Sequence, residues 1–304
     1  MSAPSSSIPA LRMERLGKRF GTTDALVDLS LTVPAGEVFG FLGPNGAGKS
    51  TTIRLLLGLL RPTAGGAWIH GDPVGDVERA HRHLAYVPAD VALWPSLTGR
   101  ECLDLLAGVG PGTDAAYRDT LLERFALDPD RRARTYSTGN RQKVALVAAF
   151  ATRAPVLVLD EPTSGLDPLM EREFRACIAE AAGRGQTVFL SSHQLGEVEA
   201  ICSRVGILRS GRLVQVAGLA DLRHLHRAEV VVDLAAPAPW LQRLAELSGV
   251  ADLRWPSPVR LELALTGPPG AVLRALGDAD VAHLEVREPS LEEIFLGYYG
   301  EVPA

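Results

Sequence analysis

The chain has 304 residues, which predicts about two domains with enough apolar residues for real cores. Its formal charge is −5 and no basic stretch stands out, so the sequence argues against a nucleic-acid-binding protein. None of the three cysteines lies in a CxxC pair, which argues against a metal site or a disulfide and fits a reducing cytosol. No apolar run approaches the roughly 18 residues that span a bilayer. We therefore expect a soluble chain that reaches a membrane only through a partner.

The apolar pattern of residues 11–60 predicts strands, then a loop and a helix. Residues 1–10 are rich in Ser and Pro and predict a disordered N-terminus. Segments 11–16 and 29–33 alternate apolar and polar residues as strands do. Segment 37–42 is an apolar run typical of a strand, and 53–60 has the apolar spacing of a helix. The segment between the last two is therefore a strand-to-helix connection.

This connection is rich in glycine and continues into the helix. Glycine permits left-handed backbone angles that turn N–H groups toward one anion, and the helix adds the positive end of its dipole. Lys49 supplies a mobile charge for phosphates, and the Ser50 hydroxyl can ligate Mg²⁺. The alternative is a simple turn between core elements, but the full spacing with Lys-Ser favours a phosphate-binding loop. The residues predicted to bind a nucleoside triphosphate here are Gly43, Pro44, Asn45, Gly46, Ala47, Gly48, Lys49, Ser50, Thr51 and Thr52.

The middle of the chain alternates predicted helices and buried strands. The region from about residue 96 to 150 is mostly helical by its apolar spacing. The continuous apolar run 156–159 is typical of a strand buried on both faces of a parallel sheet, and it ends in Asp160 and Glu161. The further elements predicted are a strand at 85–88, a helix at 169–182, a strand at 187–190 and two short strands at 205–208 and 212–216.

After a polar hinge at 224–227 the pattern changes to a β-α-β-β-α-β order, which predicts an α+β ferredoxin-like domain. Its strands are expected at 228–234, 251–255, 260–265 and 281–287, its helices at 239–247 and 268–276, with a closing helix at 291–298. We place a first domain at residues 11–218, with a helical subdomain at about 91–150, and a C-terminal accessory domain at 219–304.

The order of motifs resembles one protein family. Tyr136–Asn140 lies upstream of the strand that ends in Asp160, Ser164–Asp167 follows that strand, and His193 comes just after the next strand. This resembles the nucleotide-binding subunit of an ATP-binding-cassette (ABC) transporter. The segment Glu288–Leu296 is similar to a motif that closes the added C-terminal domain in the drug-export branch. The resemblance implies an α/β fold with a parallel-sheet core, an antiparallel β subdomain and a helical subdomain.

The resemblance also implies roles in ATP hydrolysis. Asp160 is expected to hold Mg²⁺ opposite Ser50, and Glu161 to orient or deprotonate the attacking water. The alternative for an Asp-Glu pair after a strand is a helix N-cap with a solvated neighbour. His193 matches the switch histidine that contacts the γ-phosphate. Phe20 matches the aromatic that stacks on adenine, although packing onto the sheet edge is the other possibility.

The stretch at 136–140 corresponds to the signature of the family, usually Leu-Ser-Gly-Gly-Gln. Ser137 and Gly139 match it, whereas Tyr136, Thr138 and Asn140 depart from it. In the family this stretch caps the γ-phosphate bound by the opposite subunit, so that ATP is sandwiched between two subunits. We therefore assign Ser137, Thr138, Gly139 and Asn140 to nucleotide binding. The Cβ of Thr138 is expected to alter this contact modestly without abolishing it.

The chain departs from the family after the strand at 85–88. Ala89 stands where the family usually has a Gln that senses Mg²⁺, and we hypothesise that Asp90 contacts the metal if the loop shifts by one residue. The following Leu93–Leu97 is apolar in a loop. It is either ordinary core or the socket for a partner's coupling helix, and its position favours the socket.

We predict an ATP-hydrolysing subunit of an ABC transporter that exports drugs, antibiotics or other amphipathic compounds. Its partners would be an integral membrane permease and a second ATPase subunit, most simply another copy, at the cytoplasmic face of the membrane, with no nucleic acid. One alternative is a soluble ABC-type mechanical ATPase acting on ribosomes or DNA, against which stand the single cassette and the absence of a basic tract. A signalling ATPase that transports nothing is the other alternative, and the sequence does not separate it from an exporter.

Overall fold

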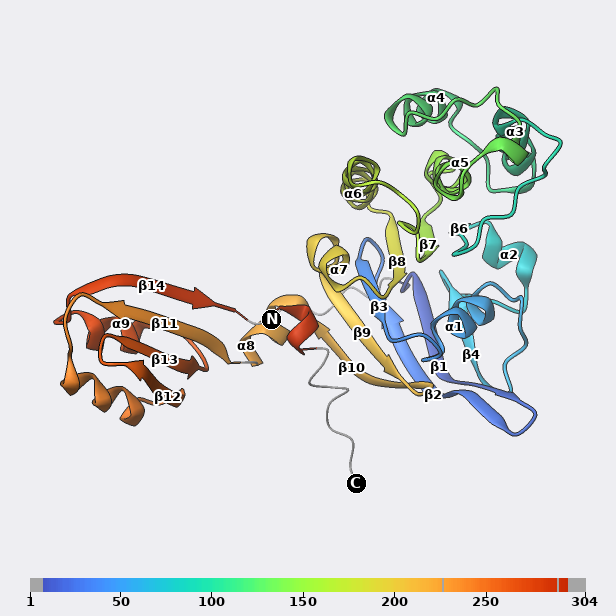
Figure 1. Ribbon diagram of the computed structural model, residues 1–304. Helices are drawn as coiled ribbons and strands as arrows, with labels where there is room; N and C mark the ends of the chain where they lie inside the picture. Colours follow the sequence, from blue (N-terminus) through green and yellow to red (C-terminus); the bar gives the residue numbers. More distant parts are fainter. Residues whose placement is uncertain (1–7, 226, 289, 295–304) are drawn as a thin grey trace. The chain divides into compact units, whose positions relative to one another are not determined.

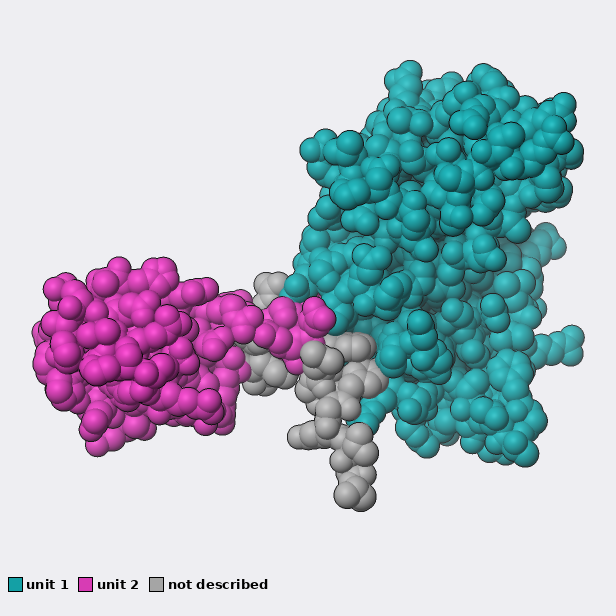
Figure 2. Space-filling view, viewed as in Figure 1, with its two compact units in different colours: residues 1–216 teal, residues 217–304 magenta. Residues whose placement is uncertain are grey.

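The computed structural model describes residues 8–225, 227–288 and 290–294. The chain divides into two compact units, Met1–Val216 and Ala217–Ala304 (Figure 2), against the predicted division after residue 218. Within the described residues, no helix is long and apolar enough to cross a membrane.

The first described residues correct the predicted N-terminal boundary. Residues 1–7 lie outside the described part of the chain, but Ala10 is fully buried. The carbonyl of Ala10 accepts a hydrogen bond from the backbone N–H of His70 at 2.9 Å. Because a buried, bonded residue is not disordered, the prediction of disorder up to residue 10 was wrong at Ala10.

A six-stranded sheet forms the centre of the first unit (Figure 1). Its strand order is β10-β9-β3-β8-β7-β6, and the pairs β3–β8, β3–β9, β7–β8 and β6–β7 are parallel. The strands are β3 (Val38–Leu42), β6 (Leu84–Val87), β7 (Val156–Asp160), β8 (Thr187–Ser192), β9 (Arg204–Arg209) and β10 (Arg212–Gly218). Every residue of β3, β7 and β8 is buried, as expected for apolar runs covered on both faces of a parallel sheet.

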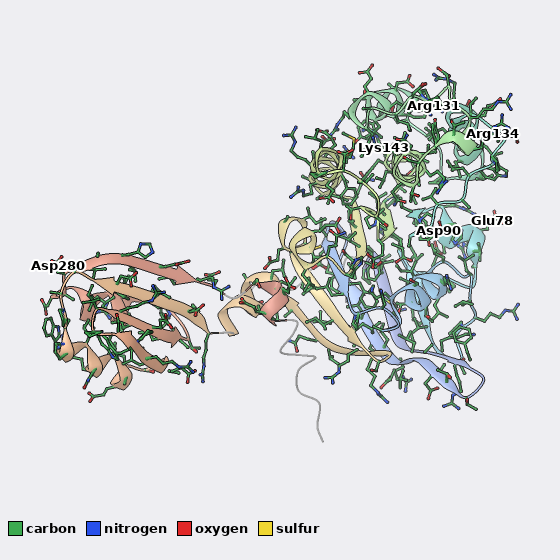
Figure 3. The ribbon with its side chains drawn as sticks, in the orientation of Figure 1. Glu78, Asp90, Arg131, Arg134, Lys143 and Asp280 are labelled. Atoms are coloured by element: carbon green, nitrogen blue, oxygen red, sulfur yellow. The ribbon has the colours of Figure 1, made fainter. Side chains whose placement is uncertain are left out.

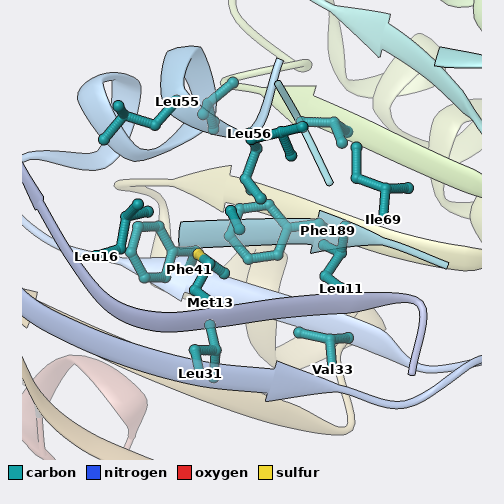
Figure 4. Close-up of a cluster of buried hydrophobic side chains, with 14 of the residues drawn as sticks. Leu11, Met13, Leu16, Leu31, Val33, Phe41, Leu55, Leu56, Ile69 and Phe189 are labelled. Atoms are coloured by element: carbon teal, nitrogen blue, oxygen red, sulfur yellow. The ribbon is translucent and has the colours of Figure 1, made fainter. Parts of the chain in front are cut away.

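An antiparallel sheet with the order β2-β1-β4-β5 packs against this centre. Its strands are β1 (Leu11–Phe20), β2 (Thr23–Val33), β4 (Ala64–Ile69) and β5 (Asp72–Pro73). Leu11 and Met13 of β1 join Phe41 and Phe189 of the six-stranded sheet in one buried cluster (Figure 4), where the two rings lie 5.2 Å apart. Strand β1 continues to Phe20, four residues past the end of the strand predicted at 11–16.

Helices flank the six-stranded sheet and form a subdomain beside it (Figure 1). They are α1 (Lys49–Leu56), α2 (Val77–His81), α3 (Gly99–Val109), α4 (Ala115–Arg124), α5 (Thr138–Ala151), α6 (Pro168–Gly183) and α7 (Leu195–Ile201), with a short 3₁₀ helix η1 (Ala133–Thr135). Side chains of Thr98, Asp114 and Ser137 cap the N-termini of α3, α4 and α5. Residues 91–97 of the predicted helical subdomain form no helix.

The second unit contains a four-stranded antiparallel sheet with the order β12-β13-β11-β14, which is that of a split βαβ arrangement. Its elements are α8 (Leu219–Leu225), β11 (Ala228–Leu234), η2 (Pro239–Glu246), β12 (Val250–Ser257), β13 (Arg260–Leu265), α9 (Gly270–Leu276) and β14 (Val281–Arg287). The predicted hinge at 224–227 overlaps the end of helix α8, and residue 226 lies outside the described residues.

One helix of the second unit differs from the prediction, and another is described only in part. The segment predicted as an α-helix at 239–247 is the 3₁₀ helix η2, whose buried Leu241 and Leu244 lie one 3₁₀ turn apart. The closing helix begins at Leu291 and is described up to Ile294. The rest of the predicted helix at 291–298, and Pro289, Phe295 and Leu296 of the C-terminal motif, lie outside the described residues.

Candidate functional site

The glycine-rich loop joins the end of β3 to the start of α1. Gly48, the N-cap of α1, has φ +111°, and a Cβ there would lie 2.8 Å from the carbonyl oxygen of Ala25. A Cβ on Gly43 would lie 2.6 Å from the carbonyl oxygen of Leu208. Both positions therefore require glycine, and the loop follows a strand and opens a helix as a phosphate-binding loop must.

Lys49 places the charge of this loop beside an acidic side chain. Its side chain is buried, and Nζ donates to the carbonyl oxygen of Gly43 at 2.6 Å. The same Nζ lies 3.6 Å from Oε1 of Glu161. Thr52 Oγ1 donates to the carbonyl oxygen of Gly48 at 3.0 Å, while Ser50 and Thr51 are half-buried on the first turn of α1. The loop thus brings an ammonium group and a hydroxyl to the same end of the sheet.

Strand β7 ends in the acidic pair of the site. Asp160 is buried, and its Oδ1 accepts a hydrogen bond from Ser191 Oγ at 2.5 Å on the neighbouring strand β8. The backbone N–H of Glu161 donates to the carbonyl oxygen of Ser191 at 3.1 Å. Glu161 has φ +49°, a left-handed conformation that costs a non-glycine residue free energy. Such conformations concentrate at functional sites, where the surroundings hold them in place.

Glu161 also contacts the predicted switch histidine. Its Oε2 lies 2.5 Å from His193 Nδ1, so the carboxylate stands between Lys49 and His193. The Glu161 side chain is 18% exposed and that of His193 is 56% exposed. Because β3, β8 and β7 are parallel neighbours, the residues that follow them meet at one edge of the sheet. This topology explains why residues far apart in the sequence meet.

The signature stretch lies at the start of α5. Ser137 caps this helix by accepting a hydrogen bond from the Asn140 N–H at 3.3 Å, and Thr138 Oγ1 accepts one from Arg141. A Cβ on Gly139 would lie 2.4 Å from the carbonyl oxygen of Gly165, in the loop that follows β7. The first turn of α5 therefore packs directly against the loop that carries Glu161. Its exposed N-terminus has the geometry that favours an anion.

Two oxygen donors suited to Mg²⁺ follow from the elements above: Ser50 lies on the first turn of α1, and Asp160 ends β7. The Asp160 carboxylate and the Ser50 hydroxyl are the hard donors that this ion prefers. Within the described residues, no group of three or more His, Cys, Asp and Glu side chains could hold a metal by itself. That donor set fits an ion that keeps several waters and phosphate oxygens among its ligands. Asp90 is exposed in the loop after β6, next to the strand that ends in Asp160 (Figure 3).

Phe20 lies at the end of β1 with its ring 48% exposed. The ammonium of Lys18 lies 4.9 Å from the ring centroid. The ring is therefore not part of the core, and it keeps a free surface for stacking. Both possibilities raised by the sequence, stacking on adenine and packing onto the sheet edge, stay predictions.

Sequence reasoning missed three residues next to the site. Gln142 of α5 is buried and its Nε2 donates to the carbonyl oxygen of Pro162 at 2.9 Å. Tyr86 has its pKa raised to about 12, first by burial and then by the charge of Asp160. Glu197 of α7 accepts hydrogen bonds from Thr163, in the loop after β7, and from Ser192, the last residue of β8. For Gln142 and Glu197, a single polar residue on a helix gives no sequence signal that separates it from a solvated face.

An apolar cavity of about 330 Å³ lies between β6, the loop that follows it, α3 and α5. Trp94 in this loop is 46% exposed, and Arg118 is the one charged residue among those that line the described cavity. Its lining includes Tyr86, Val91, Leu93, Trp94, Leu103, Leu106 and Val109. An open apolar surface of this kind is typical of a binding site for another chain.

The sequence model of the ABC transporter family matches residues 26–164. The chain is 36% identical over 310 residues to the daunorubicin resistance ATP-binding protein DrrA3 of Streptomyces coeruleorubidus, covering 96% of each chain. It is 32% identical over 303 residues to the uncharacterized ABC transporter ATP-binding protein YhcH of Bacillus subtilis, again covering 96% of each. Among solved structures, an ATP-binding subunit of an ABC transporter is similar with a TM-score of 0.67 and 33% identity, covering 71% of this chain and 92% of that one.

Proposed function

We propose a specific role on the premise that this chain belongs to the ATP-binding proteins of ABC transporters. It binds ATP and Mg²⁺, hydrolyses ATP and drives a separate membrane permease that exports an amphipathic compound of the drug or antibiotic type. The family and its ATPase activity follow from the relatives that match nearly the whole chain and from the solved ATP-binding subunit that matches 71% of it. The export of drugs rests on the drug-resistance relative, which covers the C-terminal unit as well.

The observation that carries the chemistry is the contact of Glu161 with both Lys49 and His193. Lys49 and the N–H groups of the loop would bind the phosphates of ATP. Glu161 would accept the proton of the attacking water, and His193 would hold the Glu161 carboxylate and the γ-phosphate in place. Mg²⁺, when bound by Asp160 and Ser50, neutralises charge on the phosphates.

We propose that two copies of the chain sandwich two ATP molecules. Ser137, Thr138, Gly139 and Asn140 of one copy would contact the γ-phosphate bound by the other through the N-terminus of α5. Within one copy, Gly139 lies close to Gly165 in the loop after β7, so the signature of each copy is coupled to the loop that carries its own Glu161. One chain carries every motif, so a homodimer has two competent sites.

The apolar cavity beside Trp94 is where we propose that the permease docks. Residues of the loop at 88–94, which follows β6, line this cavity, so a permease helix bound there would contact the loop directly and move with it. We place the chain at the cytoplasmic face of the membrane, held by this partner, and propose that Asp90 in the same loop contributes to metal contact in place of the Gln that the family usually has at Ala89.

The Glu161→Gln substitution tests the proposed mechanism. It keeps the size of the side chain but removes the base, so ATP hydrolysis should fall by about 10²- to 10⁴-fold while ATP binding remains. The variant should accumulate as an ATP-bound dimer that elutes early in size-exclusion chromatography. Glu123→Gln, an exposed carboxylate on α4, is the matched control and should behave as the unmodified chain. Normal hydrolysis by Glu161→Gln would refute the assignment of the base.

A further inference from the structure

Glu197 lies on α7 between the two loops that carry the catalytic side chains. Its Oε2 accepts a hydrogen bond from Ser192 Oγ at 3.0 Å and another from Thr163 Oγ1 at 3.2 Å. Ser192 ends β8 and immediately precedes His193, whereas Thr163 follows Glu161 and Pro162 after β7. One carboxylate oxygen therefore joins the two loops.

The loop after β7 needs such support because of its backbone. Glu161 is held at φ +49°, and a conformation of this kind persists only when neighbouring bonds determine it. Gln142 holds Pro162 from the side of α5, and Glu197 holds Thr163 from the side of α7. Glu197 differs from Gln142 because it also bonds to Ser192, the residue that immediately precedes His193.

We propose that Glu197 is a positioning residue that fixes Glu161 and His193 relative to each other by bonding to the loops that carry them. The inference deepens the proposed function and rests on it, because it needs Glu161 and His193 to act together. Among the described residues no hydrogen bond joins Glu197 to either side chain, and Glu197 acts by its bonds to Thr163 and Ser192. Losing these bonds should lower the rate of hydrolysis and leave the phosphate-binding loop unchanged.

The electrostatic surroundings of Glu197 give this role a pH dependence. Burial raises the pKa of its carboxyl to about 6, and the bonds from Ser192 and Thr163 oppose this shift. Glu161 faces it from the loop after β7, while Glu171 and Arg175 of α6 line the same polar cavity of about 160 Å³. Its Oε1 is buried without a hydrogen-bond partner among the described residues.

The sign of the pH effect follows from which form accepts the two bonds. Above pH 6 the carboxylate accepts from both hydroxyl groups. As the pH falls through about 6, protonation weakens these bonds, because a neutral carboxyl is a poorer acceptor than a carboxylate. The rate of hydrolysis should therefore gain an acidic limb near pH 6 that belongs to Glu197.

The test compares Glu197→Ala and Glu197→Gln in the full chain, with Glu171→Gln as a matched control from the same cavity. Glu197→Ala should lower kcat at least tenfold with an unchanged KM for ATP. Glu197→Gln keeps only a neutral acceptor oxygen, as the protonated carboxyl does, so at pH 8 it should show the reduced kcat that the unmodified chain reaches below pH 6, and it should lack the acidic limb near pH 6. Glu171→Gln should keep the kcat of the unmodified chain at pH 8, and its acidic limb should move to lower pH, because the charge of Glu171 raises the pKa of Glu197. A kcat within twofold in Glu197→Ala, or an unchanged acidic limb in Glu197→Gln, would overturn the proposal.

A second pair of variants tests the same two hydrogen bonds even if Glu197→Ala does not fold. Ser192→Ala and Thr163→Val remove the two donors separately, and each should lower kcat in the unmodified chain. Neither should have a further effect when combined with Glu197→Ala, because the bond is already lost. Additive losses would contradict the proposal. Glu161→Gln separates the two levels of inference: if it abolishes hydrolysis while Glu197→Ala keeps kcat within twofold of the unmodified chain, only the role of Glu197 fails.

Discussion

The six-stranded sheet of the first unit and the four-stranded sheet of the second unit place their polar side chains differently. In the first, strands β3, β7 and β8 are parallel and fully buried, and their polar residues collect where the strands end. In the second, the strands are antiparallel, and the polar residues lie along the face opposite the core, where Arg260 pairs with Asp233 and Glu262.

This difference teaches where chemistry can be built. Parallel strands end at one edge, so Lys49, Glu161 and His193 from three segments meet there. Antiparallel strands end alternately at two edges, which separates the residues that follow them. The described residues of the second unit therefore give a packed core and a surface of paired charges.

The largest difference in stability between the two units is expected from Leu263→Ala. Leu263 is buried in the core of the second unit, and its truncation should lower the free energy of unfolding of that unit by about 2–5 kcal/mol. Calorimetry of the full chain should show one transition that moves to lower temperature and another that does not. The affinity for ATP, measured by titration, should be unchanged.

The control for this experiment is Val231→Ala, a half-buried residue of β11 on the opposite face of the same sheet. It should cost less than Leu263→Ala, because less apolar surface is lost. If Leu263→Ala lowered every transition and weakened ATP binding together, the two units would unfold as one, and the comparison between them would fail.

A smaller effect is expected inside the first unit from Gly139→Ala. The added Cβ would lie 2.4 Å from the carbonyl oxygen of Gly165, which is backbone and cannot rotate away. Relief of this clash should move α5 away from the loop after β7 at a cost of about 1–3 kcal/mol. We expect the rate of ATP hydrolysis to fall about tenfold, which corresponds to about 1.4 kcal/mol.

Gly183→Ala is the matched control, because a Cβ at this end of α6 meets no atom within 4 Å. It should leave the rate of hydrolysis unchanged. Equal rates for the two variants would show that the close approach of Gly139 and Gly165 does not matter for the reaction.

Some parts of the site could be predicted from the sequence because their physics is local. Gly48 and Lys49 belong to one short loop, whose spacing specifies the turn and the charge. Asp160 ends an apolar run that is typical of a buried strand, so its place at the sheet edge could be predicted. The family and its fold are confirmed by relatives that match nearly the whole chain. The roles of the individual site residues stay predictions until the variants are assayed.

Other parts could not be predicted because they depend on tertiary contacts. The bonds of Gln142 and Glu197 join segments that are distant in the sequence, and nothing in their own helices marks them. The 3₁₀ helix η2 replaced the expected α-helix because the packing of Leu241 and Leu244 against the sheet decided its winding. Ala10 was assigned to a disordered tail because its buried contact lies on β4 and its following turn, not on its neighbours.

The smallest effect is expected from Arg260→Ala on the charged face of the second unit. Arg260 Nη1 lies 3.5 Å from Asp233 Oδ1 and Arg260 Nε lies 3.1 Å from Glu262 Oε1, but about one-third or more of each side chain is exposed. Exposed ion pairs contribute about 0–1 kcal/mol, and salt screens them. The transition of the second unit should therefore shift slightly in low salt and less in high salt. A shift as large as that of Leu263→Ala, or one that salt does not reduce, would mean that paired charges on the open face hold this sheet together more than its apolar core does.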